Sequence, residues 1–198
     1  MTLANVARRL KPGGVPALLL VTDPLRLPDP LPAAAGLPRG AAVVLRSYGD
    51  PAREQLADAL AALCRRRRLV LLVAADWRLA ERVGAAGLHL PEHMARHGVL
   101  APLLGWRRRR GALLSVACHS PAALARAKAI GADWAVLSPV FATASHPVAA
   151  TIGPLRLAAW VRRAGLPVVA LGGIGEKTAG RLHHSGVAGL AAIGAFTK

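Results

Sequence analysis

Short apolar runs recur along the whole chain, separated by segments in which apolar residues have helical spacing. The runs hold about four to seven apolar residues without alternating polar positions, which is typical of parallel strands buried on both faces. They are ALLLVTD from Ala17, AAVVLRS from Ala41, LVLLVAAD from Leu69, AGLHLP from Ala86, LLSVACHS from Leu113, DWAVLSPVF from Asp133, PVVALGGI from Pro167 and GLAAIGAF from Gly189. Eight such runs predict a closed (β/α)₈ TIM barrel, and an open doubly wound sheet is the alternative.

The segments between the runs predict the crossover helices that parallel strands require. Residues 50–65, 120–130 and 151–163 carry Ala, Leu and Arg at helical spacing, and shorter helices are expected over 77–83 and 178–185. The Pro-rich stretch 24–38 leaves little room for a regular first helix, and the helix after the eighth strand should be short or missing. Residues 1–10 are expected to supply a helix at the barrel floor.

The length of 198 residues fits one barrel with short loops and leaves no room for a second domain. We therefore expect a single domain over 1–198, with 1–16 as an N-terminal extension. No apolar run approaches the roughly 20 residues of a membrane span, and we find no export signal. Cys64 and Cys118 lie far apart without metal-ligand spacing. These features predict a cytoplasmic protein without a disulfide framework.

The net charge of +16 is the strongest hint of a polyanionic partner. Part of this charge is concentrated in the runs Arg65–Arg68 and Arg107–Arg110. However, aromatic residues make up only 4% of the chain, and no helix-turn-helix, RNP or zinc-finger pattern is present. We therefore predict that the runs are solvated ends of helices or loops, where cations complement the helix dipole, and not a nucleic-acid site.

Four segments, AGLHLPE, SVACHS, GADWAVLSPVFATASHP and PVVALGGI, resemble in order and spacing the family of thiamine-phosphate synthase and the thiazole tautomerase TenI. The resemblance implies a small phosphorylated thiazole ligand at the carboxyl ends of the strands. In many barrels the loops after the last two strands bind phosphate, because glycine lets backbone N–H groups approach the anion. The resemblance assigns this role to Gly172, Gly173, Ile193 and Gly194, and the family commonly has serine in place of Gly194.

Candidate catalytic groups follow the fourth, fifth and sixth runs. An imidazole titrates near neutrality, so His119 at the end of the fifth run can carry a proton. In TenI-like tautomerases the matching histidine is the general acid/base, and synthases tend to have it as well. Glu92, where the family often has glutamine, is a second acid/base candidate. Ser138 and His146 are expected to bind substrate, although synthases have a lysine in place of His146.

The synthase pattern is only partly present. Arg46 matches a substrate-binding arginine, and Asp76 matches a carboxylate that would bind Mg²⁺ if the protein is a synthase. Other pattern positions are replaced, by Val44, Tyr48, Ala75, Ala86 and Ala117. Each lost charge-assisted contact removes roughly 1.5–3 kcal/mol, which disfavours diphosphate chemistry.

The leading prediction is therefore a TenI-like tautomerase that moves a proton on a thiazole monophosphate and needs no cofactor. One alternative is a divergent thiamine-phosphate synthase, which would use Mg²⁺ to condense thiazole phosphate with the pyrimidine diphosphate. Another is a non-catalytic barrel that binds a phosphorylated ligand for regulation. His93 and His97 could share a helix face, but without a third ligand they predict no metal site. A homodimer would cover the apolar surface left by an incomplete ring of helices.

Overall fold

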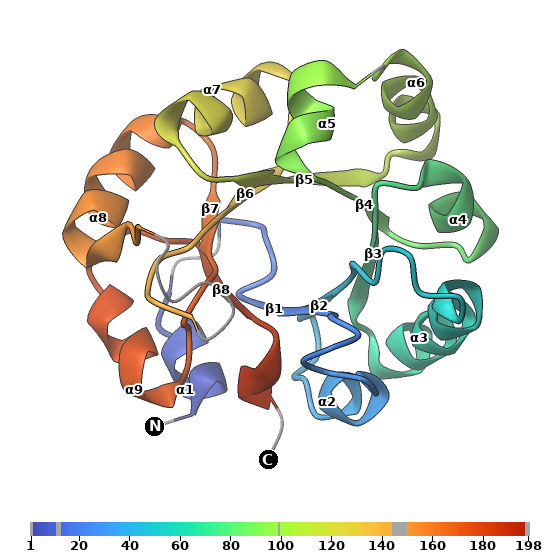
Figure 1. Cartoon of the computed structure of the whole chain (residues 1–198), viewed down its shortest axis with the longest axis horizontal. Helices are drawn as coiled ribbons and strands as arrows, with labels where there is room; N and C mark the ends of the chain where they lie inside the picture. The colour runs from blue at the N-terminus through green and yellow to red at the C-terminus, as the bar shows by residue number, and fades with distance from the viewer. Residues whose placement is uncertain (1, 11–12, 99, 144–149, 197–198) are drawn as a thin grey trace.

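Eight parallel strands close into a barrel in chain order, as Figure 1 shows. The computed structural model describes residues 2–10, 13–98, 100–143 and 150–196. Pairing of Leu18 with Leu190 closes the first strand on the last. The predicted (β/α)₈ barrel is confirmed, and each predicted run contains one strand. The strands are β1 (Leu18–Val21), β2 (Ala42–Leu45), β3 (Val70–Ala74), β4 (Gly87–Leu90), β5 (Leu113–Cys118), β6 (Trp134–Leu137), β7 (Val168–Ala170) and β8 (Gly189–Ala192).

Helices surround the barrel. The three longer predicted helices are present, but the helix predicted over 178–185 is a four-residue helix followed by a 3₁₀ turn. The helices are α1 (Leu3–Ala7), α2 (Leu31–Ala35), α3 (Arg53–Arg67), α4 (Trp77–Arg82), α5 (Glu92–His97), α6 (Ala101–Arg110), α7 (Pro121–Ala129), α8 (Gly153–Ala164) and α9 (Glu176–Ala179), with 3₁₀ turns η1 (Gly180–Leu182) and η2 (Gly194–Phe196).

The floor of the barrel, at the amino ends of the strands, is partly covered by α1 as predicted. Ala4 and Ala7 of α1 line a cavity of about 470 Å³ together with Leu113 and Trp134, the first residues of β5 and β6. In the Pro-rich stretch, α2 forms because its proline lies in the first turn, where a missing N–H group costs little.

The strands are apolar throughout because both of their faces are buried. Leu19 and Val21 of β1 belong to a cluster inside the barrel, whereas Leu18 and Leu20 pack in the layer between the strands and the helices. Neighbouring strand residues point to opposite faces, so both sets must be apolar. Among the described residues, no helix is both long enough and apolar enough to cross a membrane.

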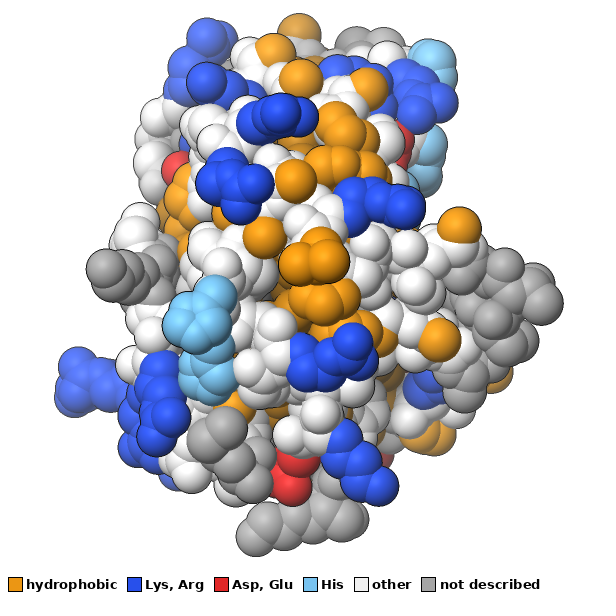
Figure 2. Space-filling model, turned by 90° about the vertical axis from the view of Figure 1, so that its left-hand side faces the viewer, with side chains coloured by type: hydrophobic (Ala, Val, Ile, Leu, Met, Phe, Trp, Pro, Cys, Tyr) orange, Lys and Arg blue, Asp and Glu red, His pale blue; other side chains and the backbone are white. Residues whose placement is uncertain are grey.

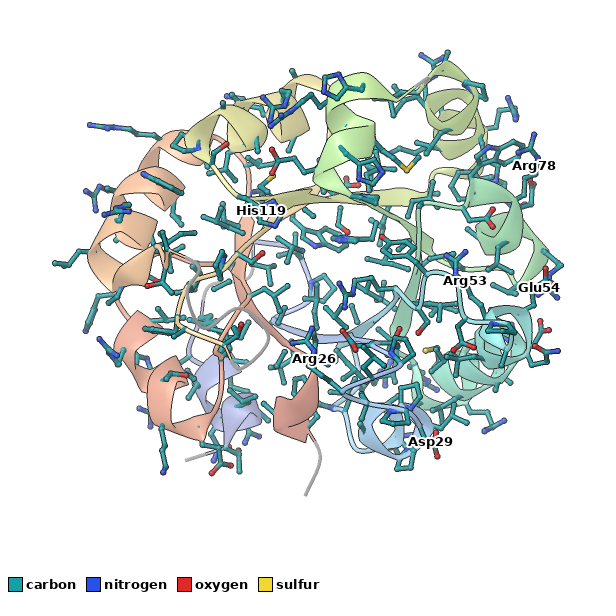
Figure 3. The ribbon with its side chains drawn as sticks, viewed as in Figure 1. Arg26, Asp29, Arg53, Glu54, Arg78 and His119 are labelled. Carbon is teal, nitrogen blue, oxygen red and sulfur yellow. The ribbon has the colours of Figure 1, made fainter. Side chains whose placement is uncertain are left out.

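All eight strands end at the same face of the barrel, and the loops that follow them form its mouth. Figure 3 shows Arg26 and His119 inside the ring of helices at this mouth, whereas Asp29, Glu54 and Arg78 lie at the outer rim. In barrels of this class, catalytic groups are found at the carboxyl ends of the strands. The fold therefore directs the search for a site to this face.

Candidate active site

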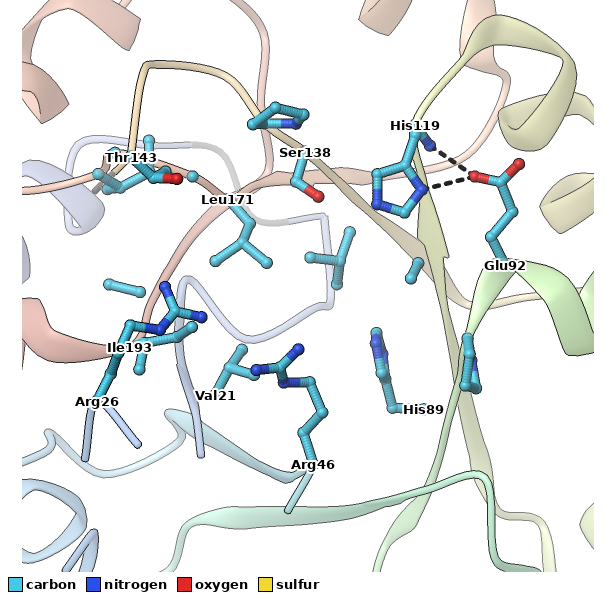
Figure 4. Close-up of a pocket in the computed structure, with 18 of the residues that line it drawn as sticks. Val21, Arg26, Arg46, His89, Glu92, His119, Ser138, Thr143, Leu171 and Ile193 are labelled. Atoms are coloured by element: carbon cyan, nitrogen blue, oxygen red, sulfur yellow. Dashed lines mark hydrogen bonds and ion pairs between the residues drawn. The ribbon is translucent and has the colours of Figure 1, made fainter. Parts of the chain in front are cut away.

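A cavity of about 1050 Å³ opens at the carboxyl ends of the strands (Figure 4). Most of the predicted site residues line this one cavity, although they come from segments that follow six different strands. Those that line it are Arg46, Glu92, His119, Ser138, Gly172, Gly173, Ile193 and Gly194. His146 lies outside the described residues. The sequence prediction that the glycine loops and His119 share a pocket therefore agrees with the geometry.

The glycine pair after β7 has a conformation that other residues resist. Gly172 and Gly173 have φ angles of 98° and 63°, in the left-handed region. A Cβ atom on Gly172 would lie 2.8 Å from the Cα of Pro139, and one on Gly173 would lie 2.6 Å from the carbonyl oxygen of Ala142. The loop is fixed by Thr178, whose hydroxyl donates to the Gly173 carbonyl at 2.7 Å. Glycine is therefore required here by both φ and close approach.

Unlike Gly172 and Gly173, Gly194 after β8 could be replaced by a residue with a side chain. Its φ is not in the left-handed region, and an added Cβ atom would meet no heavy atom within 4 Å. The serine that the family commonly has at this position would therefore fit here. Gly172, Gly173 and Gly194 all line the cavity and have no side chain to keep an anion from their backbone, although Leu171 and Ile193 of the same loops line it with side chains.

Glu92 at the start of α5 holds His119 at the end of β5. The Glu92 Oε2 atom lies 2.7 Å from His119 Nδ1 and accepts a bond from the His119 backbone N–H at 3.0 Å. Its other oxygen accepts bonds from Arg96 at 2.9 Å and Arg126 at 3.0 Å. Burial acts to raise the pKa of Glu92, but the bonds from His119 and Arg96 outweigh it, so the pKa lies below its ordinary value.

An ionised Glu92 can only accept hydrogen bonds, so His119 Nδ1 carries the proton in this pair. In a neutral imidazole, the other nitrogen, Nε2, then has a free lone pair. Figure 4 shows the His119 ring projecting from the carboxylate toward the cavity. The pair is therefore arranged as a proton acceptor that is oriented by a carboxylate, a combination that suits general acid/base catalysis.

Two arginines on the opposite wall share one carboxylate. Asp23, just after β1, accepts bonds from Arg26 at 2.8 Å and from Arg46. Burial acts to raise the pKa of Asp23, but the Arg26 bonds and the charges of Arg26 and Arg46 outweigh it, so the net pKa is lowered. Arg96 of α5 also lines the cavity. Arg26 and Arg46 are therefore paired with Asp23 and Arg96 with Glu92, so the three arginines that line the cavity share two carboxylates.

His89 lies in β4 and forms part of the cavity wall. Its Nδ1 atom lies 2.7 Å from the hydroxyl oxygen of Ser115 on β5. Burial, reinforced by the charge of Arg46, lowers the pKa of His89 to about 4. The imidazole is therefore neutral near pH 7 and offers the cavity a hydrogen bond without a charge.

The carboxylates do not fit a Mg²⁺ site as they are arranged. Asp76 caps α4 by accepting from the Leu79 N–H at 3.0 Å, lies 3.7 Å from Arg53, and does not line the cavity. Asp23 is occupied by two arginines. No three His, Cys, Asp or Glu side chains of the described residues lie together as a metal site. Charge compensation for an anionic substrate is therefore available here from arginine.

Sequence reasoning missed Arg26, Asp23 and Arg96 and considered His93 and His97 only as metal ligands, although all five line the cavity or bind its arginines. Two spacings could have indicated part of this set. Arg26 lies three residues after Asp23, and Arg96 lies four residues after Glu92, the spacing at which side chains meet on a helix.

Comparison with known proteins gives a consistent picture. The family model described as thiamine monophosphate synthase matches residues 21–196. The thiamine-phosphate synthase of Thiobacillus denitrificans is 37% identical over 191 residues, covering 95% of this chain and 89% of its own. That of Chromobacterium violaceum is 38% identical over 168 residues, covering 82% of this chain and 78% of its own.

A solved structure, thiamine phosphate pyrophosphorylase from Pyrococcus furiosus, has a similar fold. It superposes with a TM-score of 0.71 at 24% identity, covering 96% of this chain and 88% of that one. The curated relatives carry the name synthase, so the comparisons support the transferase alternative better than the tautomerase that the sequence favoured. They support an enzyme of the synthase type with small phosphorylated substrates.

Proposed function

The chain belongs to the thiamine monophosphate synthase family, and from this we propose that it is a transferase that joins a pyrimidine diphosphate to a thiazole monophosphate. The observation that carries the proposal is the charge of the cavity. Arg26 and Arg46 share the carboxylate of Asp23, and Arg96 and Arg126 share that of Glu92, so four arginines at the cavity face two carboxylates. A surplus of arginine suits a substrate with several negative charges, such as a diphosphate.

The missing lysines of the synthase pattern do not argue against this activity. Arg26 and Arg96 come from the loop after β1 and from α5, outside the pattern positions, and they restore cationic partners to the cavity. A guanidinium binds a phosphate through two parallel N–H bonds, so the replacement of lysine by arginine retains the interaction.

In the proposed reaction, the thiazole nitrogen attacks the methylene carbon of the pyrimidine. The new C–N bond forms as the C–O bond to diphosphate breaks, and diphosphate leaves with the electron pair of that bond. Arg26 and Arg46 stabilise the negative charge that grows on the leaving group. The backbone at Gly172, Gly173 and Gly194 holds the thiazole phosphate so that the ring nitrogen faces the methylene carbon. A volume of about 1050 Å³ has room for both substrates.

A second candidate is the tautomerase, which the Glu92–His119 pair favours. A proton acceptor oriented by a half-buried carboxylate at 2.7 Å is what a proton transfer on a bound thiazole phosphate needs. The transferase reaction gives this pair no obligatory proton to move. The transferase therefore depends on Arg46 and not on His119, whereas the tautomerase depends on His119.

The decisive experiment compares Arg46→Gln and His119→Ala in two assays. One assay measures thiamine phosphate and diphosphate formed from the substrate pair, with and without Mg²⁺, and the other measures conversion of the thiazole phosphate tautomer. For a transferase, Arg46→Gln should lower kcat/KM by roughly 10- to 150-fold, while His119→Ala leaves it within a few fold.

For a tautomerase, His119→Ala should cost about 100- to 10,000-fold, and the substrate pair should not react. Arg78→Gln, at an exposed arginine on the outer rim of the mouth, is the matched control and should behave as wild type in both assays. Failure of the wild-type protein to form thiamine phosphate under any of these conditions would refute the transferase proposal.

A further inference from the structure

The cationic runs gather at the barrel floor, the face opposite the candidate active site. In a closed parallel barrel, every helix ends where the next strand begins, so the carboxyl ends of the helices surround the floor. The arginine runs occupy these ends. Arg65–Arg68 end α3 just before β3, Arg108–Arg110 end α6 just before β5, and Arg162–Arg163 end α8 before β7.

Two further arginines lie nearer the centre of this face. Arg8 and Arg39 line the cavity of about 470 Å³ between α1 and the first residues of the strands. The carbonyl of Arg68 accepts a hydrogen bond from the Gly40 N–H at 3.0 Å, so the end of α3 adjoins the segment of Arg39. We call Arg8, Arg39, Arg65–Arg68, Arg108–Arg110 and Arg162–Arg163 the floor arginines.

The floor arginines are exposed and unneutralised. Each has an exposed side chain, and within the described part of the chain none lies within 4 Å of a carboxylate. Asp133 is the acidic residue at the start of β6, and it is already bound by Arg107 at 2.9 Å. Figure 2 shows, for the side of the molecule formed by α8 and α9, that Lys and Arg side chains greatly outnumber Asp and Glu. The eleven floor arginines therefore place much of the +16 charge on one face.

Against the expectation from the sequence that the arginine runs are not a nucleic-acid site, we propose that the barrel floor binds the phosphate backbone of double-stranded nucleic acid. Repeated guanidinium groups match a partner with repeated phosphates, which each guanidinium can bind through two N–H bonds. The contacts would be to phosphates rather than to base edges, so binding is independent of sequence. This proposal is separate from the reaction proposed for the opposite face, and either can fail without the other.

The floor does not suit two other polyanions, a membrane with anionic lipids and a single-stranded nucleic acid. The exposed large apolar side chains of the described residues are Leu25, Tyr48 and Leu155, which follow β1 and β2 or begin α8, and all three therefore lie toward the mouth. A floor without them has nothing to insert into a bilayer. It also has no exposed aromatic ring on which the bases of a single strand could stack. A duplex keeps its bases stacked and can be bound through its phosphates alone, so it needs neither.

The test measures binding of a fluorescein-labelled 20-base-pair DNA duplex of arbitrary sequence by fluorescence anisotropy, at 50 and 200 mM NaCl. The wild-type protein should bind, with affinity that falls steeply as salt rises. The double variant R109Q/R110Q should lower the salt slope by about 1.8, because each lost phosphate contact contributes about 0.9. Across this fourfold change in salt, its affinity should fall about 12-fold less than that of the wild type.

The matched control is R78Q/R156Q, which removes two exposed arginines near the starts of α4 and α8, at the other end of the barrel. It changes the net charge equally and should keep the wild-type slope. An equal loss in this control would show diffuse attraction and overturn the proposal. So would tighter binding to the single 20-base strand, tighter binding to vesicles containing phosphatidylserine, or no duplex binding at 50 mM NaCl.

Discussion

Substitution of His89 by asparagine should remove much of the pH dependence of stability between pH 8 and pH 5. The pKa of His89 is lowered from 6.5 to about 4 because the ring is buried and faces Arg46. The folded state therefore holds His89 neutral at a pH where the unfolded chain binds a proton. Stability from this source is present above the unfolded pKa of 6.5 and is lost as the pH falls toward 4.

The size of this effect follows from the two pKa values. At pH 5, the unfolded histidine is almost fully protonated and the folded one is mostly neutral, so the protein loses about 2 kcal/mol relative to pH 8. In His89→Asn, the amide can keep a hydrogen bond to Ser115 but cannot titrate. The variant should therefore lose about 2 kcal/mol less than the wild type over this interval, whatever its stability at pH 8.

Urea unfolding followed by circular dichroism at pH 8, 7, 6 and 5 gives the free energy of unfolding of both proteins. The comparison uses the change with pH, so a general destabilisation by the substitution does not affect it. Parallel curves for the wild type and His89→Asn would refute the argument that His89 is buried as a neutral ring.

Three further substitutions test the backbone geometry. Gly173→Ala should destabilise the protein by about 2–4 kcal/mol, since its Cβ would meet Ala142 and Phe141 at 2.6 and 2.7 Å in a left-handed residue, whereas Gly194→Ser should leave urea unfolding unchanged. Equal stability of these two variants would contradict the described loops. Ala75→Asn should raise Tm by about 1–4 °C in calorimetry, because Ala75 has a φ of 63° that asparagine adopts more readily, and an unchanged Tm would contradict this strain.

The barrel could be predicted from the sequence because its strands are buried on both faces. Strand β1, with Leu19 and Val21 inside and Leu18 and Leu20 outside, has no polar position, and this pattern distinguishes a parallel strand from a surface strand. Helix α6 was not predicted. It buries only Leu103 and Trp106 and ends in four arginines, so its apolar spacing is too weak to identify.

The site could be predicted only where its residues follow strands. His119 and Gly172 come directly after apolar runs, so the closure of the barrel brings them to one mouth. Arg26 and Arg96 lie on a loop and a short helix whose paths no periodicity defines. The electrostatic potential of a cavity depends on the sum of the charges that line it, whichever element supplies them. A comparison of motif positions therefore counts the lysines that are missing but not the arginines that replace them, and it underestimates the capacity of this cavity for a diphosphate.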